Sequence, residues 1–410
     1  MSSGTPGFIG RRLKQVREAR LLTGIALAEL VGVTPASITQ YEKGKQKPTP
    51  DTLQRLASVL NVEPAFFTRP MPDDEPASAV FWRSAASATA AARRRAQSRY
   101  DWLREIVDVL RTFMELPRVH FPPAVVSSDP SRLDTAEIER LAVEARRFWG
   151  LGYGAISDVT LLLENNGAVV ARGELAAHTL DAFSQWRWRS NVPYLFFGTE
   201  KDSAARHRFN VAHELGHLLL HRYVPQVKIG RMEQHALVEQ QANRFAGAFL
   251  LPAERFQDML YAPTLDAMLA LKAQVNVSVG LMIHRVSDLG MASDEHTKRL
   301  WMNYTRRRWR SHEPLDGEIP VERPRLLRRA VEMLVQSGVQ SKAQFRGRFG
   351  LPASDLEDLV GLPRGYLSDT PPEPRLLHFP TSRPPQQGEI KGERPGNGRV
   401  IPFPSNRKQG

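Results

Sequence analysis

The chain has 410 residues, a formal net charge of +12 and no cysteine. This length exceeds that of one compact domain, and a hydrophobic content of 41% is ample for buried cores. The absence of cysteine excludes disulfide bonds and thiolate metal sites. No apolar run reaches the length of a membrane span and residues 1–7 lack the order of a secretory signal, so we expect a cytoplasmic protein without membrane partners.

Residues 8–69 show the pattern of a small helical domain. Gly32 permits a tight turn between two short helices, and Thr34 is placed to cap the helix that follows. The apolar residues expected in its core are Leu30, Ile38 and Leu56. This segment resembles the XRE-type helix-turn-helix. The resemblance rests on Arg11-Arg12-Leu13, Leu27-Ala28-Glu29-Leu30, Gly32-Val33-Thr34 and Tyr41-Glu42-Lys43-Gly44. It departs from XRE domains at Thr23-Gly24, where they usually carry a glutamine that contacts the DNA backbone.

The helix from Pro35 to Lys43 is predicted to enter the major groove of double-stranded DNA. Its outward side chains are short or carry an amide, which suits contacts to base edges; they are Ser37, Thr39 and Gln40. Three lysines are expected to contact phosphates, namely Lys43, Lys45 and Lys47. The positive charge of this region favours DNA over the alternative, a helical bundle used only for protein contacts.

Residues 70–150 are interpreted as a linker followed by connecting helices. The run from Pro70 to Pro76 has the composition of a linker, whereas Ala85 to Met114 carries apolar residues at helical spacing. That apolar stripe is interpreted as core or as the surface of a homodimer. A further helix is predicted from Asp134 to Phe148.

Two short runs, 167–171 and 192–197, are rich in residues that favour strands. They predict a small sheet beside the segment that follows them. The edge of such a sheet would hold an extended peptide by strand addition.

The run from Arg206 to His221 reads RHRFNVAHELGHLLLH and contains an HExxH motif formed by His213, Glu214 and His217. Two histidines four residues apart share a helix face and can each give one nitrogen to Zn²⁺, while Glu214 is placed to act as general base. Histidines also occur at this spacing without a metal. The apolar flanks favour the metal, because ligation removes the desolvation cost of two buried histidines and a glutamate.

A catalytic zinc site needs a third protein ligand, for which Glu239 is the candidate. Glu239 is placed at the start of a second apolar helix that Pro252 ends, with Asn243 on the same face to hydrogen-bond a ligand histidine. The alternative for Glu239 is an exposed carboxylate at a helix start. His221 is expected to turn away from the metal, and His235 is expected to be a polar residue at a helix start.

On these residues the chain resembles the ImmA/IrrE family of metallopeptidases, from about Ile156 to Arg310. The family carries a run like RFNVAHELGHLLLH followed by one like EQQANRFAGAFLLP. The resemblance implies a gluzincin-like zinc metalloendopeptidase domain, which we place at 151–310. In it His213, His217 and Glu239 would bind Zn²⁺ and Glu214 would be the catalytic base. It also implies a protein substrate, because members of this family are known for cleaving repressors that contain a helix-turn-helix.

Residues 320–368 alternate helical runs with Gly-Leu-Pro turns and predict a small helical module, including a helix at 326–335. Residues 369–410 are dense in proline, glycine and arginine and are predicted to be disordered. The predicted fold class is multidomain and mostly α. It combines an all-α helix-turn-helix domain, an α+β zincin-like peptidase domain and the small helical module.

Two functions remain open at this point. The first is a DNA-binding transcriptional regulator with a zinc endopeptidase that cleaves a helix-turn-helix repressor or itself. The alternative is a transcription factor whose zincin-like domain senses a ligand or partner without proteolysis. Glu214 favours the first, because a structural zinc site needs no general base. As donors to the oxyanion, Tyr194, His178 and Arg222 are all candidates.

Overall fold

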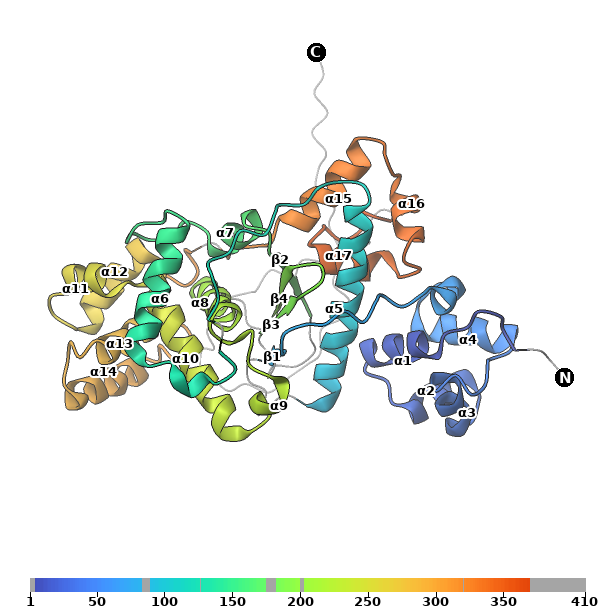
Figure 1. Ribbon diagram of the computed structural model, residues 1–410, viewed down its shortest axis with the longest axis horizontal. Helices are drawn as coiled ribbons and strands as arrows, with labels where there is room; N and C mark the ends of the chain where they lie inside the picture. Colours follow the sequence, from blue (N-terminus) through green and yellow to red (C-terminus); the bar gives the residue numbers. More distant parts are fainter. Residues whose placement is uncertain are drawn as a thin grey trace, which may run out of the picture. The chain divides into compact units, whose positions relative to one another are not determined.

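The computed structural model describes residues 4–82, 89–125, 127–174, 182–199, 203–319 and 321–368. These residues are mostly helical and include one small sheet (Figure 1), so the predicted fold class is confirmed. The predicted disordered tail, residues 369–410, lies outside the described residues.

The amino-terminal domain consists of four α-helices and a short 3-10 helix. They are α1 Gly10–Ala19, α2 Gly24–Val31, α3 Pro35–Glu42, α4 Pro50–Leu60 and η1 Pro64–Thr68. A threonine hydroxyl caps each of α2, α3 and α4 by accepting a backbone N–H three residues later; the caps are Thr23, Thr34 and Thr49. Gly32 ends α2 with a φ of 71°, which suits glycine and turns the chain into α3. The predicted turn at Gly32 and cap at Thr34 are confirmed.

The core of this domain contains Ile38 and Leu56, as predicted, but not Leu30. Leu30 is 60% exposed, so its assignment to the core is wrong. The buried residues of α2 are Leu27, Ala28 and Val31. Successive residues of an α-helix are about 100° apart, so Leu30 lies about 200° around the axis from Ala28 and faces solvent.

A long helix, α5 (Ala90–Arg111), follows the linker. The predicted helix starts earlier, at Ala85, but residues 83–88 lie outside the described part of the chain. The apolar stripe of α5 is buried; its members are Trp102, Leu103, Ile106 and Leu110. These side chains share one core with the amino-terminal helices, with one face of the sheet and with the carboxyl-terminal helices. The stripe is therefore core of the same chain and not a dimer surface.

The sheet has four strands in the order β1-β3-β4-β2. They are β1 Phe81–Trp82, β2 Val169–Gly173, β3 Ala182–Arg187 and β4 Val192–Gly198. β3 pairs antiparallel with both β1 and β4, whereas β2 and β4 are parallel. The strands predicted at 167–171 and 192–197 correspond to β2 and β4, with ends that shift by up to two residues. The sequence did not indicate β1 or β3.

Eleven helical elements are described between α5 and the carboxyl-terminal module. They are η2 Pro130–Arg132, α6 Thr135–Phe148, α7 Val159–Asn165, α8 Ala204–Gly216, η3 His217–His221, α9 Gln226–Ile229, α10 Met232–Leu250, α11 Ala253–Met259, α12 Leu265–Val275, α13 Val279–Asp288 and α14 Asp294–Arg306. The module itself comprises α15 Leu326–Gln336, α16 Lys342–Gly347 and α17 Ala353–Val360. The helices predicted at 134–148 and 326–335 correspond to α6 and α15.

The two faces of the sheet pack against different helices, because successive side chains of a strand point to opposite sides. Residues on the face toward α5 include Phe183, Tyr194 and Phe196. Residues on the face toward α8 and α10 include Val170, Leu195 and Phe197. The sheet therefore lies between α5 and α8 (Figure 1), and its second face supports the segment that carries the HExxH motif.

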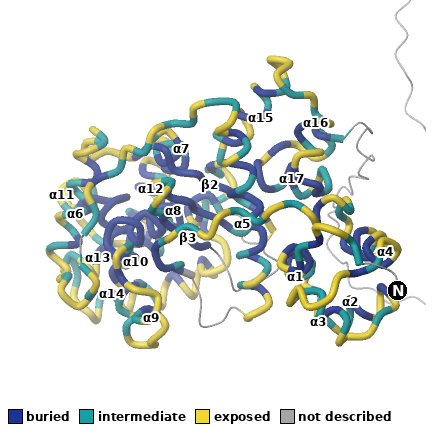
Figure 2. The backbone as a smooth tube through the Cα atoms, turned by 45° about the vertical axis from the view of Figure 1, so that its right-hand side comes forward, coloured by how far each residue is buried: buried dark blue, intermediate teal, exposed yellow. Residues whose placement is uncertain are grey.

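Helix α8 is buried along most of its length and α10 along its second half (Figure 2), and the two helices pack closely against each other. Gly216 marks their point of closest approach: a Cβ atom there would lie 3.3 Å from the Cα of Ala242 and 3.2 Å from Phe245 Cδ1. A larger residue at 216 would push the two helices apart.

No single described helix combines the length and the apolar character that a membrane span requires. Only α12 and α13 taken together, with a bend of 110° between them, meet these criteria.

Candidate metal centre

The three HExxH side chains are fully buried at the carboxyl-terminal end of α8. His213 and Glu214 belong to α8 itself, and His217 begins the single π-helical turn η3 that continues the helix. Such turns are rare inside α-helices and often occur at functional sites. The helix places both imidazoles on one side, with their ring centroids 4.7 Å apart.

Asn243 determines which nitrogen of His213 faces the centre. Its Oδ1 lies 2.8 Å from Nδ1 of His213. A carbonyl oxygen only accepts hydrogen bonds, so Nδ1 of the neutral ring carries the proton and Nε2 keeps a lone pair. This is the contact that the sequence predicted for Asn243.

A longer chain of hydrogen bonds orients His217. The amide nitrogen of Gln241 donates to the carbonyl oxygens of Pro130 at 2.8 Å and Leu133 at 3.1 Å, so its Oε1 faces Nε2 of His221 at 2.9 Å. His221 therefore carries its proton on Nε2, and burial lowers its pKa to about 3, which keeps the ring neutral. Nδ1 of His221 then accepts from Nδ1 of His217 at 3.1 Å. The Nε2 lone pair of His217 is left to face the centre.

These side chains bring three electron-pair donors to one point. The two Nε2 atoms of His213 and His217 are 3.0 Å apart, and the carboxylate of Glu239 lies 3.5 Å from the first and 3.2 Å from the second. All three ligand atoms lie within 4.8 Å of one another. Because neither Nε2 carries a proton in this network, a cation between the three groups would offset the repulsion between their electron pairs. Two imidazoles and one carboxylate are a donor set that suits Zn²⁺.

Glu239 lies in the middle of α10 and not at a helix start as the sequence suggested. α10 already begins at Met232, seven residues earlier. No side chain caps this start, and Met232 is 89% exposed, so the usual start signals are absent from the sequence there. The alternative of an exposed helix-start carboxylate is therefore wrong: Glu239 is 21% exposed and faces both histidines.

Glu214 is held by a residue that the sequence analysis did not identify. Ser184 of β3 donates its hydroxyl to Oε2 of Glu214 at 2.5 Å, and both side chains are fully buried. The hydrogen bond fixes the carboxylate beside the three potential ligands. β3 thus contributes directly to the site.

The remaining candidates fall outside the centre or outside the described residues. His235 is half-buried in the first turn of α10. Tyr194 packs on the α5 face of the sheet, opposite to α8, so it is wrong as an oxyanion donor. Arg222 stacks its guanidinium 4.2 Å from the ring centroid of Trp186. His178 lies outside the described residues.

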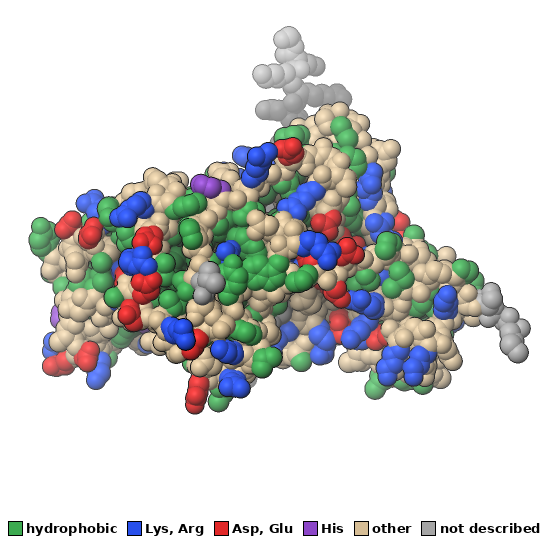
Figure 3. Space-filling model, in the orientation of Figure 1, with side chains coloured by type: hydrophobic (Ala, Val, Ile, Leu, Met, Phe, Trp, Pro, Cys, Tyr) green, Lys and Arg blue, Asp and Glu red, His purple; other side chains and the backbone are tan. Residues whose placement is uncertain are grey.

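The residues predicted to contact DNA lie on α3 and in the turn after it. Two of the hydroxyls bond within their own helix: the Ser37 hydroxyl is 2.9 Å from that of Thr34, and Thr39 donates to the carbonyl oxygen of Pro35 at 3.1 Å. Gln40 is half-buried, and the three lysines Lys43, Lys45 and Lys47 are exposed. Lysine and arginine side chains elsewhere on the drawn face are scattered and form no single field (Figure 3).

Comparison with known proteins assigns two segments of the chain. Residues 13–67 match the helix-turn-helix family. Residues 163–287 match the peptidase family described as the IrrE N-terminal-like domain. The second match contains the HExxH residues, Glu239 and Asn243.

Curated relatives match a short stretch of this chain. The uncharacterized HTH-type transcriptional regulator y4aM of Sinorhizobium fredii is 37% identical over 67 residues, which is 16% of this chain and 47% of the relative. The HTH-type transcriptional regulator PuuR of Escherichia coli is 37% identical over 68 residues, 16% of this chain and 37% of PuuR. RghRB of Bacillus subtilis, an uncharacterized HTH-type transcriptional regulator, is 43% identical over 54 residues, 13% of this chain and 39% of the relative. The chain therefore spans less than half the length of each of these relatives.

These matches agree with both resemblances read from the sequence. The chain carries an XRE-type helix-turn-helix domain at residues 13–67 and an IrrE-like domain of a peptidase family at residues 163–287.

Proposed function

We propose that this protein is a transcriptional regulator that binds double-stranded DNA through α1 to α4 and hydrolyses peptide bonds at a zinc site. The observation that carries the proposal is the convergence of two unprotonated Nε2 atoms, 3.0 Å apart, with the Glu239 carboxylate. The base Glu214 follows the first of these histidines in the chain. A site that only bound metal would have no use for a buried carboxylate held by Ser184.

In the proposed mechanism His213, His217 and Glu239 would hold Zn²⁺. When bound, the ion would supply Lewis acidity toward the scissile carbonyl and a water molecule. Glu214 accepts a proton from the attacking water and later donates it to the leaving amine. Ser184 keeps the Glu214 carboxylate in place during both transfers. Loss of cleavage in a Glu214→Gln variant that still holds Zn²⁺ tests this mechanism.

The proposed substrate is a helix-turn-helix repressor or this chain itself. This choice rests on the resemblance to the ImmA/IrrE family and on the fusion of the two domains in one chain. The alternative, a regulator whose zinc domain senses a partner without cleaving it, is favoured by one observation. Strand β1 comes from the linker, pairs with β3 at Ser184 and stacks Phe81 on His217, so the chain itself occupies this side of the centre.

For the DNA-binding half of the proposal, we expect two kinds of effect in the full-length chain. Gln40→Ala should reduce the preference between operator sequences, because an amide that reads a base edge is lost. Lys45→Ala should weaken binding to all sequences and lower the slope of log affinity against log salt by about 1, because one phosphate contact is lost. Electrophoretic or anisotropy titrations at several salt concentrations measure both.

The matched control for these titrations is Lys298→Ala, which removes an exposed lysine of α14. It should bind DNA as the wild type does. If Lys45→Ala and Lys298→Ala are equally harmless, α3 does not read DNA and the domain serves protein contacts.

A further inference from the structure

The segment between the amino-terminal domain and α5 passes beside the HExxH residues. We call residues 75–82 the strap. Its pairing with β3 consists of hydrogen bonds from Ser78 N to Trp186 O at 2.8 Å and from Trp188 N to Pro76 O at 3.0 Å, followed by the antiparallel pairs Phe81–Ser184 and Trp82–Phe183. β3 would be an edge strand without these contacts, because the strap alone separates it from the end of the sheet.

The opposite side of the strap contacts residues that follow the HExxH segment. The backbone N–H of Val80 donates to Oε1 of Gln226 on α9 at 2.8 Å. Ala79 and Phe81 are buried in a small apolar cluster with Val224 and Ile229. The strap therefore lies between β3 and α9, with main-chain hydrogen bonds on the β3 side and a hydrogen bond to the Gln226 side chain on the other.

Phe81 brings the strap into direct contact with the metal centre. Its ring stacks on the imidazole of His217, with centroids 4.5 Å apart and an interplanar angle of 10°. In the strand register Phe81 lies opposite Ser184, the residue that holds Glu214. The strap backbone thus runs next to the residue that holds Glu214.

The start of the strap is anchored by Glu75. Its carboxylate accepts hydrogen bonds from Arg187 Nε at 3.0 Å and from the backbone N–H and hydroxyl of Ser190 at 3.0 and 2.9 Å. Burial of Glu75 opposes its ionisation, but these donors outweigh burial and lower its pKa. The charged hydrogen bonds of Glu75 thus join the start of the strap to the end of β3 and the turn that follows it.

We propose that the strap is a tethered competitor of peptide substrates. It occupies the edge of β3 that aligns an extended peptide by strand addition, and the site accepts a substrate only when the strap leaves. This inference rests on the proposed peptidase function for its biological meaning. A tethered segment has an effective concentration on the order of millimolar, so a free peptide at micromolar concentration competes poorly with it.

A binding experiment on the full-length chain tests the proposal without relying on catalysis. The probe is a fluorescent peptide with the sequence of residues 75–82, EPASAVFW, and every protein carries Glu214→Gln so that the probe is not cut. Ser78→Pro removes one ladder donor and the hydroxyl that accepts the Trp186 N–H, and Phe81→Ala removes the ring on His217. The double variant should bind the probe at least about tenfold more tightly than the parent chain. Asp74→Ala, a change at an exposed linker residue before the strap, is the matched control and should bind like the parent.

A crosslink that holds the strap on β3 provides the opposite change to its release. Ala77 and Arg187 are direct antiparallel partners, whose Cα spacing suits a disulfide, and the chain has no other cysteine. Ala77→Cys with Arg187→Cys should exclude the probe when oxidised and admit it after reduction. Equal probe binding by the parent, the released and the oxidised chains overturns the proposal, and so does a released chain that folds, holds zinc and binds no probe.

The same variants with Glu214 restored separate this inference from the proposed function. Release should then raise cleavage of a peptide substrate at least about tenfold, because the open fraction of the site limits the apparent affinity. If probe binding follows the expected pattern but no form cleaves any peptide, the peptidase function fails and the strap remains a plug of a peptide-binding cleft.

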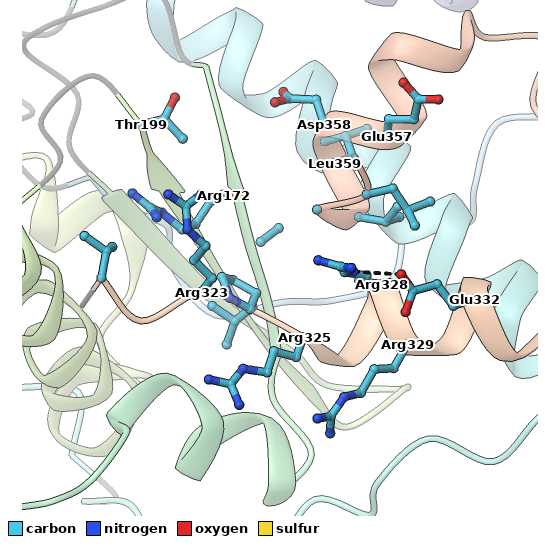
Figure 4. Close-up of a pocket in the computed structure, with 17 residues that line it drawn as sticks. Arg172, Thr199, Arg323, Arg325, Arg328, Arg329, Glu332, Glu357, Asp358 and Leu359 are labelled. Carbon is cyan, nitrogen blue, oxygen red and sulfur yellow. Dashed lines mark hydrogen bonds and ion pairs between the residues drawn. The ribbon is translucent and has the colours of Figure 1, made fainter. Parts of the chain in front are cut away.

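A second, independent feature is a cavity of about 620 Å³ between β2, the segment before α15, α15 and α17. Figure 4 shows arginines reaching it from three of these elements; they are Arg172, Arg323, Arg325, Arg328 and Arg329. The acidic residues of its wall have partners in the protein. Glu332 accepts from Arg328, Asp358 pairs with Arg99, and Glu357 accepts the backbone N–H groups of Gly365 and Leu367. Among the arginines, Arg325 also pairs with Asp158, which lies outside the wall.

We infer that this cavity binds a small ligand with several phosphate or carboxylate groups. Its volume lies within the range of about 300–1,000 Å³ that small-molecule sites occupy. Guanidinium groups bind both kinds of anion through paired hydrogen bonds, and five arginines line this one cavity. The binding site belongs to no step of the proposed peptide hydrolysis.

Calorimetric titration of the full-length chain with inorganic tripolyphosphate tests this inference. Arg323→Ala with Arg329→Ala should lower the affinity at least about tenfold, because charge-assisted hydrogen bonds are lost. Arg140→Ala with Arg299→Ala, which removes two exposed arginines from other helices, is the control and should leave the affinity unchanged. Loss of binding in Lys43→Ala with Lys45→Ala and its retention in the cavity variant would place the anion on the DNA-reading helix and overturn the inference.

Discussion

Glu214→Gln is expected to abolish proteolysis while zinc binding and DNA binding persist. Glutamine has nearly the same shape, and the Ser184 hydroxyl can still donate to its carbonyl oxygen, so the buried site should stay folded. An amide cannot take the proton of the attacking water, and general base catalysis contributes on the order of 10²–10⁴-fold in rate. The measurement compares wild type and variant for cleavage of a helix-turn-helix repressor and of the chain itself, in cells and with purified protein.

The control for this comparison is Glu233→Gln, which changes an exposed glutamate in the first turn of α10. It should cleave like the wild type. Metal analysis and DNA titration of each variant separate loss of chemistry from loss of structure. If Glu214→Gln regulates its target genes as the wild type does, and no fragment forms in either strain under stress, the sensor function replaces the peptidase function.

The sequence predicted the parts of this site that lie close together in the chain. His213, Glu214 and His217 form a local pattern, and Asn243 follows Glu239 by four residues, which is one helical turn. Helical periodicity also located α6 and α15. These features depend on short-range geometry, which residue spacing encodes directly.

The parts that escaped prediction depend on contacts between distant segments. Ser184 lies in a strand that is buried on both faces, so β3 shows no alternation of polar and apolar residues. The strap reads as an Ala, Ser and Pro linker, and only pairing with β3 makes it a strand. The link from Gln241 through His221 to His217 needs the π-helical turn, which residue spacing did not reveal.

The wrong assignment of Leu30 to the core also reflects contacts that the sequence does not show. Its type suits a core, but the buried side of α2 is set by contacts with the other helices of the domain. One residue of helical rotation decides whether a leucine is buried or exposed. Periodicity over a helix of eight residues is too short to fix that rotation.

Removal of the metal ligands should eliminate zinc from the protein. We expect about one Zn²⁺ per purified chain, because one three-ligand centre is present in the described residues, and none in His213→Ala with His217→Ala. Glu239→Ala should weaken affinity and leave α10 intact, because Glu239 is mid-helix and alanine favours helices. Atomic absorption after dialysis against a competing chelator measures the content and the affinity.

The hydrogen bonds from Gln241 through His221 to His217 allow a second test of zinc binding. Gln241→Leu removes the acceptor that sets the tautomer of His221, and through it that of His217, without touching a ligand. Zinc affinity should fall about 10–100-fold, as it does when outer partners of ligand histidines are lost. His235→Ala, on the same helix, should leave the affinity unchanged. Tight zinc binding in Glu239→Ala together with loss in His235→Ala would move the third ligand to His235, and the network drawn from Asn243 and Gln241 would then be structural only.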